Sequence, residues 1–219
     1  MKKLVIAIDG PSGAGKGTIA RTLSQHLGYR HVDTGAMYRA IGWKANREGI
    51  RLDDEEAVAG LARRADILVE DGVVSIDGHD VTRAIRTPEI DKAATAVARL
   101  PRVRDVMVAR QRMLGEGGGV VMEGRDIGTV VFPNADLKIY LDASAEERAR
   151  RRAGDAAHSG GQAGHAAVAE SIQARDTSDT TRAVSPLTIA ADAEHIDTTG
   201  MPIDQVVDTV MTLVRQRSS

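Results

Sequence analysis

The sequence contains no cysteine, few aromatic residues and no long apolar run. The absence of cysteine excludes a disulfide-bonded scaffold, a thiolate metal site and a cysteine nucleophile. One Trp, three Tyr and one Phe in 219 residues are too few for the aromatic platforms on which single-strand nucleic acid binders stack bases. The net charge of −2, from 29 basic and 31 acidic residues, provides no bulk attraction to nucleic acid or to an anionic membrane.

Export and membrane signals are also weak. Lys2 and Lys3 precede a short apolar run at residues 4–8 that ends at Asp9, whereas the apolar region of a signal peptide needs roughly 7–15 residues. No stretch approaches the roughly 20 apolar residues of a membrane helix. We therefore expect a cytoplasmic protein that is monomeric and binds neither membrane nor nucleic acid.

The composition is that of a globular protein, because 42% of the residues are apolar and 27% are charged. The length suits a single domain over residues 1–219. Short β-branched apolar runs predict strands at residues 4–8, 30–32, 120–122, 137–141 and 195–197. Apolar periodicity and capping residues predict helices at residues 16–27, 36–48, 53–65 and 101–114, further helices from 88 and from 145, one at 166–175, and a last one from 203.

This alternation of strands and helices predicts a three-layer α/β domain with a mostly parallel sheet. Residues 67–86 interrupt it with three short β-rich runs, separated by Asp71-Gly72 and Asp77-Gly78. Because Asp-Gly favours tight hairpin turns, the segment is predicted to be a small antiparallel insert. Residues 154–164 are rich in Gly, Ala, Ser and His without apolar periodicity, so we expect a mobile loop there.

Polar residues follow three of the predicted strands. Asp9-Gly10 follows the first, Asp33-Thr34 the second, and residues 123–126 a later one. In parallel α/β sheets, ligands bind beyond the carboxyl ends of the strands. We therefore expect these polar residues to meet at one crevice.

Residues 10–18, Gly-Pro-Ser-Gly-Ala-Gly-Lys-Gly-Thr, join the first predicted strand to the first predicted helix with the Gly-x4-Gly-Lys spacing of a phosphate-binding loop. Glycines let successive backbone N–H groups point at one anion, and the helix N-terminus adds a positive dipole. A plain glycine turn would explain the glycines but not the lysine. We expect Lys16 to reach the β- and γ-phosphates, and the donor to be bound by Gly10, Ser12, Gly13, Ala14, Gly15, Lys16, Gly17 and Thr18.

The residue after the lysine departs from the general motif, which has Ser or Thr there to bind Mg²⁺. Here Gly17 comes before Thr18. We therefore expect Mg²⁺ to be bound mainly through phosphates and water, with no protein ligand to the metal. Thr18 is expected near the α- or β-phosphate.

Further basic residues suggest that the acceptor of the phosphoryl group is itself a phosphate. For a single arginine, a solvated surface position is the default interpretation. Several arginines around a phosphate loop instead suit a reaction in which many phosphoryl oxygens are neutralised at once. The arginines in question are Arg39, Arg125, Arg148, Arg151, Arg152, Arg175 and Arg182.

Five motifs in this order resemble the bacterial cytidylate kinase family, and the resemblance runs essentially from end to end. The first, at 10–18, is shared by many kinases, and its Gly-Lys-Gly-Thr is the variant found in nucleoside monophosphate kinases. The others are specific in this order: Asp-Thr-Gly-Ala-Met-Tyr-Arg at 33–39, Pro-Arg-Val-Arg at 101–104, Gly-Arg-Asp-Ile-Gly-Thr-Val-Val-Phe-Pro at 124–133, and Arg-Asp-x-x-Asp-x-x-Arg-Ala-Val at 175–184.

The resemblance implies the P-loop NTPase fold and phosphorylation of CMP or dCMP by ATP with Mg²⁺, in pyrimidine nucleotide metabolism. It implies that residues 66–95 are the insert that binds the nucleoside monophosphate. It also implies that residues 148–182 are a helical lid that closes over ATP, with Arg148 among the residues on that nucleotide.

The resemblance also implies roles for individual residues. Thr34 would lie near the bound CMP, with Thr95 and Arg104 facing the cytosine and Asp126 near its amino group. The arginines that match those on the CMP phosphate are Arg39, Arg125 and Arg182. Arg175 and Asp179 match groups near the ribose. The catalytic residues would be Lys16, Arg125 and Arg152, which would stabilise the transferring phosphoryl group.

Two other functions remain open at this point. A kinase for a small hydroxylated metabolite would share the phosphate loop, with Asp33 as the base on an alcohol, but would not need arginines around an acceptor phosphate. A nucleotide switch that signals through its lid would bind ATP without acceptor-dependent turnover. An assay with several acceptors separates the three functions.

Overall fold

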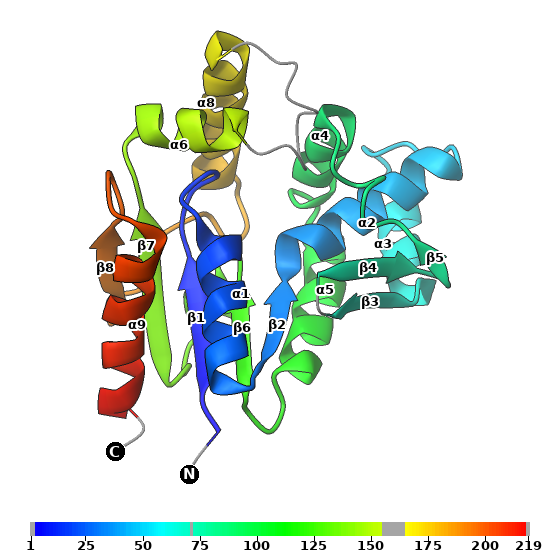
Figure 1. Cartoon of the computed structure of the whole chain (residues 1–219). Helices are drawn as coiled ribbons and strands as arrows, with labels where there is room; N and C mark the ends of the chain where they lie inside the picture. The colour runs from blue at the N-terminus through cyan, green and yellow to red at the C-terminus, as the bar shows by residue number, and fades with distance from the viewer. Residues whose placement is uncertain (1–2, 71, 155–164, 218–219) are drawn as a thin grey trace.

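The structure is a computed structural model that describes residues 3–70, 72–154 and 165–217. Its main sheet has five parallel strands in the order β2-β6-β1-β7-β8 (Figure 1). The strands are β1 Val5–Asp9, β2 Arg30–Asp33, β6 Val120–Glu123, β7 Leu137–Asp142 and β8 Glu194–Asp197. Because all five run in one direction, their carboxyl ends form a single edge, as the alternating sequence pattern predicts.

Helices cover both faces of this sheet and form the three layers (Figure 1). The helices are α1 Lys16–Leu27, α2 Thr34–Arg47, α3 Glu55–Arg64, α4 Pro88–Val97, α5 Pro101–Leu114, α6 Ala145–Ala153, α8 His165–Thr181 and α9 Ile203–Arg217. Ile6 and Ile8 of β1 pack with α1 and α9, whereas Ala7 lies in the core on the other face with α2 and α5. Within the described parts of the chain, no helix is long and apolar enough to cross a membrane.

The predicted insert is a three-stranded antiparallel sheet in the order β3-β4-β5. Its strands are β3 Ile67–Glu70, β4 Val73–Ile76 and β5 His79–Asp80. Asp77 (φ 48°) and Gly78 (φ 76°) both have the left-handed conformation that a two-residue hairpin turn requires. The Asp-Gly signal therefore identifies this hairpin correctly.

Helix α4 packs closely on α2. A β-carbon at Gly42 of α2 would lie only 2.9 Å from the β-carbon of Ala93 on α4, so glycine permits this approach. The contact brings α4 next to the residues that follow β2, and it places both helices on the wall of one cavity, described below.

Two elements differ from the sequence prediction. Helix α8, predicted to end at residue 175, continues to Thr181. The segment 176–181 has no apolar stripe, but the hydroxyls of Thr177, Thr180 and Thr181 donate to carbonyls one turn back. A π-helical turn, η1 Ile127–Val131, was not predicted; the carboxylate of Asp9 accepts from the backbone N–H groups at its start, those of Ile127 and Gly128.

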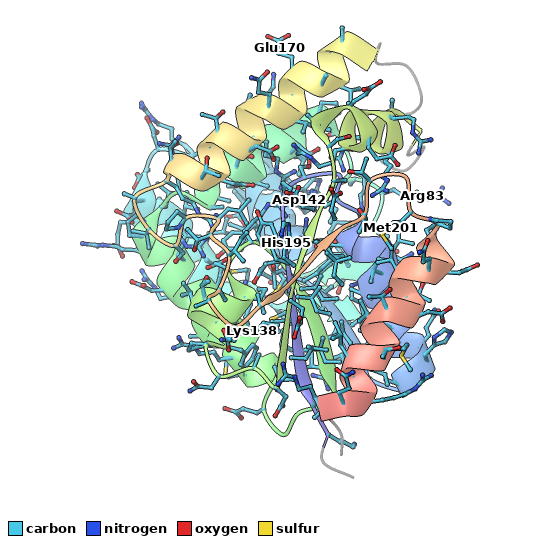
Figure 2. All side chains as sticks on the ribbon, turned by 90° about the vertical axis from the view of Figure 1, so that its left-hand side faces the viewer. Arg83, Lys138, Asp142, Glu170, His195 and Met201 are labelled. Atoms are coloured by element: carbon cyan, nitrogen blue, oxygen red, sulfur yellow. The ribbon has the colours of Figure 1, made fainter. Side chains whose placement is uncertain are left out.

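Helices α6 and α8 lie beyond the carboxyl ends of the strands, as the two views agree (Figures 1 and 2). Ser144 caps α6 by accepting from the N–H of Glu147, as the capping-box pattern predicts. Gly154 ends α6, and the rest of the predicted loop, residues 155–164, lies outside the described residues. The arginines of α6 and α8 are thereby placed at the same edge as the phosphate loop.

Candidate active site

One cavity of about 1140 Å³ opens at the carboxyl edge of the main sheet. A pocket for one drug-sized ligand has about 300–1,000 Å³, so this cavity is large enough to consider two ligands. It is lined by the phosphate loop, Asp33-Thr34, residues 123–126, and side chains of α4, α5, α6 and α8. Two of the three predicted polar clusters line it, and Asp9 of the third lies beneath η1.

The phosphate loop owes its shape to glycines. Gly10, Gly13 and Gly15 have φ of 146°, 81° and 89°, which side-chain-bearing residues rarely adopt. A β-carbon on Gly10 would lie 2.0 Å from the carbonyl oxygen of Leu141, and one on Gly13 would lie 2.8 Å from that of Arg148. The loop therefore packs directly on β7 and α6, and its backbone conformation is fixed by what surrounds it.

Lys16 is the first residue of α1, and its side chain is buried in the cavity wall. Its Nζ donates to the carbonyl oxygen of Pro11 at 2.7 Å. Burial lowers the pKa of Lys16 well below its usual value, and the nearby charge of Arg125 lowers it further, against the opposing effect of Glu123. An anion bound in the loop would restore the stability of the charged ammonium.

Two arginines of α6 contact the backbone of the phosphate loop. Arg148 donates to the carbonyl of Ser12 at 3.1 Å and pairs with Asp176 of α8. Arg151 lies within 3.5 Å of the carbonyl of Ala14 and bonds Thr198. Arg151 lines the cavity, whereas the predicted Arg148 is outside its lining. The predicted Arg148 therefore lies on the loop itself, and Arg151 is the neighbour that faces the cavity.

All nine residues predicted to bind the acceptor line the same cavity. They come from α2, α4, α5, α8 and the segments after β6 and after α8, and they are Thr34, Arg39, Thr95, Arg104, Arg125, Asp126, Arg175, Asp179 and Arg182. The predicted catalytic residues Lys16, Arg125 and Arg152 line it too, as do the donor residues from Ser12 to Thr18. Gly10 lies behind the loop and is outside the lining.

Asp126 is the centre of one buried ionic group. Its carboxylate accepts from Arg104, which is 1% exposed, and lies 3.5 Å from Nη2 of Arg182. The guanidinium of Arg104 also lies over the ring of Tyr38, 5.7 Å from its centre. Burial raises the pKa of Tyr38 to about 12, so its hydroxyl stays protonated. These side chains offer hydrogen-bond donors and one carboxylate acceptor to a ligand.

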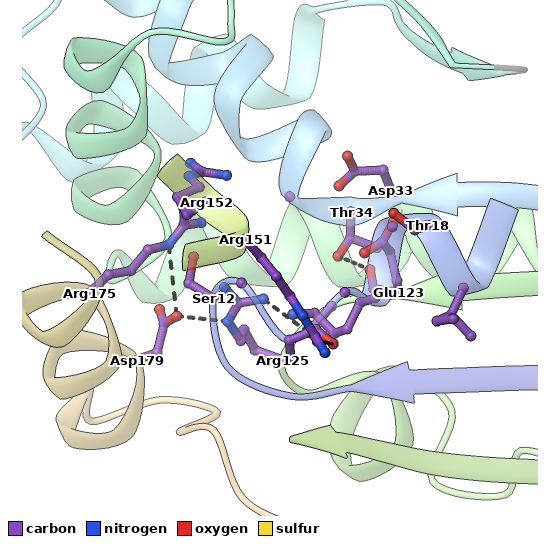
Figure 3. A pocket seen from close by; sticks show the side chains of 18 of the residues that line it. Ser12, Thr18, Asp33, Thr34, Glu123, Arg125, Arg151, Arg152, Arg175 and Asp179 are labelled. Atoms are coloured by element: carbon purple, nitrogen blue, oxygen red, sulfur yellow. Dashed lines mark hydrogen bonds and ion pairs between the residues drawn. The ribbon is translucent and has the colours of Figure 1, made fainter. Parts of the chain in front are cut away.

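A second ionic group surrounds Asp179 on α8 (Figure 3). Its Oδ2 accepts from Nε of Arg125 at 2.8 Å and lies 4.0 Å from Nε of Arg175. Burial alone would raise the pKa of Asp179, but the charges of Arg125 and Arg175 outweigh it and lower the pKa. Burial and the charges of Arg39 and Arg125 lower the pKa of Arg175 to about 10. The site holds closely spaced cations, and that arrangement suits an anionic ligand.

A third ionic group is built on Asp91 of α4, a residue that sequence reasoning missed. Asp91 accepts from Arg39 of α2 at 2.8 Å, from Arg152 of α6, and from Arg175 of α8 at 3.4 Å. No motif marks Asp91, because an acidic residue in the first turn after Thr87-Pro88 is explained by the helix dipole alone. Only the folded structure brings its three partners together.

The two predicted threonines make short-range hydrogen bonds at the cavity wall. Thr34 Oγ1 donates to the carbonyl of Glu123 at 2.7 Å, and this bond joins the start of α2 to the end of β6. Thr95 Oγ1 donates to the carbonyl of Asp91 one turn earlier on α4, at 2.9 Å. Each hydroxyl oxygen retains lone pairs that can accept a hydrogen bond from a ligand.

Glu123 and Asp33 are two of the acidic residues that line the cavity. Glu123 pairs with His31 at 3.0 Å, and a β-carbon on Gly17 would lie 3.2 Å from its Oε1. In the described part of the chain, no three His, Asp or Glu side chains form a group that could hold a metal ion by themselves. This donor set fits a magnesium ion bound through phosphate and water, with the two carboxylates as acceptors for that water.

Asp33 has a structural task as well. Its Oδ1 accepts from the N–H of Ala36 and caps α2. Burial alone would raise the pKa of Asp33, but the charges of Arg39 and Arg86 outweigh it and lower the pKa. A capping carboxylate with a lowered pKa is a weak general base.

The geometry of this site agrees with the family and the relatives to which the chain is similar in sequence. A model of the family described as cytidylate kinase matches residues 6–216. The cytidylate kinase of Desulfitobacterium hafniense is 51% identical over 219 residues, covering 99% of this chain and 94% of its own. That of Bacillus subtilis is 49% identical over 221 residues, covering 99% of both.

Solved structures support the fold alone. Shikimate kinase from Acinetobacter baumannii matches with a TM-score of 0.50 at 14% identity, covering 98% of this chain and 94% of its own. An uncharacterised protein from Eubacterium ventriosum matches with a TM-score of 0.53 at 9% identity, covering 97% and 99%. The family model and the close relatives, taken with the site, lead to one conclusion: the chain belongs to the cytidylate kinase family.

Proposed function

We propose that this member of the cytidylate kinase family transfers the γ-phosphoryl group of ATP directly to the phosphate of CMP or dCMP, giving ADP and CDP or dCDP. The observation that carries the proposal is that one cavity is lined by the phosphate loop and by all nine residues predicted to bind the acceptor. Donor and acceptor can therefore meet without leaving the site.

ATP would bind at the phosphate loop. The backbone N–H groups and the N-terminus of α1 would hold the β-phosphate, and Lys16 would turn from the Pro11 carbonyl to the β- and γ-phosphates. Bound Mg²⁺ would neutralise phosphate charge. Glu123 and Asp33 fit the water that would surround it, because both carboxylates line the cavity beside the loop.

CMP would bind at the opposite end of the cavity. Arg39, Arg125 and Arg182 would contact its phosphate, and Arg175 with Asp179 would lie near the ribose. The cytosine would lie against Thr95, Arg104 and Asp126, with Thr34 near the bound nucleotide. A carboxylate can accept a hydrogen bond from the cytosine amino group, whereas uracil has no donor at that position. Asp126 therefore would favour CMP over UMP.

The transfer would need no general base, because a phosphate oxygen of CMP is already ionised near neutral pH. Catalysis would consist of aligning two anions and neutralising their charge with Lys16, Arg125 and Arg152. Residues 148–182 would act as a lid that excludes water, and residues 66–95 as the insert that carries CMP. Water in the site would otherwise accept the phosphoryl group and waste ATP.

The geometry disfavours the metabolite kinase. That reaction needs a base on an alcohol, and its candidate, Asp33, caps α2 and has a lowered pKa.

The test is ADP release with a panel of acceptors at equal concentration: CMP, dCMP, UMP, AMP, simple polyols and none. We expect turnover with CMP and dCMP, much less with UMP, and only background with the polyols or without an acceptor. Turnover with a polyol and not with CMP would establish the metabolite kinase. ATP binding without any acceptor-dependent turnover would establish the nucleotide switch.

A further inference from the structure

Asp91 connects four helices at the cavity. It lies in the first turn of α4, and its two carboxylate oxygens accept from arginines of α2, α6 and α8. Arg39 uses its Nε and Arg175 its Nη1 for Oδ1, while Arg152 uses Nη2 for Oδ2. One carboxylate thus joins α4, most of which belongs to the predicted insert at residues 66–95, to both helices of the predicted lid.

The three arginines are exposed to the cavity, whereas Asp91 lies behind them. Arg39, Arg152 and Arg175 all line it, whereas Asp91 is outside its lining. Figure 3 shows Arg152 and Arg175 close together on the cavity wall. A ligand in the cavity would therefore meet the guanidinium groups without having to displace Asp91.

Asp91 also reduces repulsion among these cations. All three guanidinium groups are largely buried, with side chains 8%, 18% and 17% exposed for Arg39, Arg152 and Arg175. Like charges repel strongly where water is scarce. Burial alone would raise the pKa of Asp91, but the charges of Arg39, Arg175 and Arg152 outweigh it and lower the pKa well below its usual range. Asp91 therefore stays ionised among them.

We propose that Asp91 is a positioning residue for phosphoryl transfer: it holds Arg39, Arg152 and Arg175 in the orientation in which they meet the acceptor phosphate, the transferring group and the ribose, respectively. This inference rests on the proposed function, because it gives a task to arginines that the proposal places on the substrates. The same carboxylate ties α4 to α6 and α8, so it fixes the lid arginines relative to the acceptor.

The side chain of Asp91 is not needed to build α4. Thr87 supplies the cap of this helix by accepting from the N–H of Ile90 at 3.3 Å, and Pro88 occupies its first turn. Thr95 bonds the backbone carbonyl of Asp91, not its carboxylate. Replacing the carboxylate therefore leaves the local hydrogen bonds of α4 intact.

The test compares Asp91→Asn with Glu89→Gln. Both changes remove one negative charge from the first turn of α4, but Glu89 is exposed and bonds only Asn46, at 3.5 Å, among the interactions described. We expect Asp91→Asn to raise the KM for CMP about tenfold and to lower kcat about tenfold. Glu89→Gln should stay within twofold of the parent chain in both constants.

The split between the two constants separates positioning from folding. A variant that is partly unfolded has fewer active molecules, so its kcat falls while its KM for CMP stays unchanged. A misoriented Arg39 instead weakens CMP binding and raises KM. Asp91→Asn with the parent KM would overturn the inference.

A double variant tests whether Asp91 acts through the lid. Neighbours in one ionic network have non-additive effects. In an Arg152→Gln background, Asp91→Asn should therefore reduce kcat less than it does alone, while the KM for CMP still rises because Arg39 is still released. Additive effects on kcat would contradict the link to the lid. The double variant lacks the charge of Arg152, so the remaining arginines repel each other less than the three arginines do in Asp91→Asn. If Asp91→Asn melts below the assay temperature, the KM for CMP is measured with the double variant instead, and it should again be raised.

ADP release by the parent chain distinguishes failure of the proposed function from failure of the inference about Asp91. If the parent releases no ADP in the presence of CMP, the proposed function fails. If the parent is active and Asp91→Asn behaves like Glu89→Gln, only the inference about Asp91 fails.

Discussion

The two ends of the cavity would bind anions with different parts of the chain. At the donor end, the loop offers backbone N–H groups fixed by glycines, with Lys16 as the cation at the start of α1. At the acceptor end, the carboxylates of Asp91, Asp126 and Asp179 hold guanidinium groups from four helices, α2, α5, α6 and α8, and from the segments that follow β6 and α8. The residues of the loop at the donor end are contiguous in sequence, whereas the acceptor end is assembled from residues that lie far apart in the chain.

This difference predicts how each end responds to change. A backbone site is specific for the shape of a phosphate chain and tolerates few changes in its glycines. A site of paired side chains can be altered one partner at a time, and each change leaves a buried charge without its partner. Substitutions at the donor end should therefore be all-or-none, and those at the acceptor end should change selectivity.

The largest effect is expected for Lys16→Ala. Removing this cation should reduce kcat by about 10²–10³-fold, because electrostatic stabilisation of the transferring group is lost. The fold should persist, since burial already lowers the pKa of Lys16 and the cation is costly in the free protein. ADP release and a thermal melt check both statements. Near-normal turnover would contradict the role of the donor end.

Gly10→Ala tests the backbone of the donor end. Its β-carbon would overlap the carbonyl oxygen of Leu141 at 2.0 Å, and φ of 146° is unfavourable for alanine. We expect a loss of about 3 kcal/mol or more in the free energy of unfolding. Gly28→Ala is the matched control: its φ is 63°, but no atom lies within 4 Å of its β-carbon, so strain alone acts there. Equal losses from denaturant titration would refute the packing argument.

At the acceptor end, Asp126→Asn should change the choice of base. An amide presents a donor where the carboxylate has an acceptor, and we expect the ratio of kcat/KM for CMP to that for UMP to fall about 10- to 100-fold. The ratio is the appropriate measurement because both substrates see the same folded fraction. A ratio is needed because Asp126→Asn also leaves Arg104 buried without its partner, and this lowers the folded fraction for both substrates alike. An unchanged ratio would remove Asp126 from recognition of the base.

The smallest effect is expected in the pH dependence of activity, through Lys16 at the donor end. Because the pKa of Lys16 is lowered in the free protein, Lys16 loses its proton as pH rises, at a pH below that of an ordinary lysine. We expect kcat/KM for ATP to fall on this alkaline limb, and kcat at saturating ATP to fall only at higher pH, since the bound phosphates favour the ammonium. The residual activity of Lys16→Arg should lack the limb, because arginine stays protonated there. An identical limb in that variant would assign it to another group.

Most of the fold could be predicted because its signals are local. The apolar runs predict the five parallel strands, and Asp77-Gly78 predicts the hairpin of the insert. The exceptions depend on tertiary contacts. The last turns of α8 lack an apolar stripe and are held by threonine hydroxyls and ion pairs, and η1 is fixed by Asp9, whose partners lie more than a hundred residues away in sequence.

The candidate site divides in the same way. Spacing alone identifies the phosphate loop, and resemblance to a family identifies the acceptor residues. Asp91 could not be found by either route, because its three partners lie on α2, α6 and α8 and nothing in the local sequence marks it. Arg151 is one of the seven arginines that the sequence suggests for the site, but only the structure shows that it lines the cavity, whereas Arg148 does not.

The most direct test is a crystal structure with a non-hydrolysable ATP analogue and CMP bound together. The account predicts both nucleotides in the one cavity, with a phosphate oxygen of CMP about 3–3.5 Å from the γ-phosphorus and in line with the bond to be broken. Nucleotides bound in two separate pockets, or with their phosphates pointing apart, would contradict it.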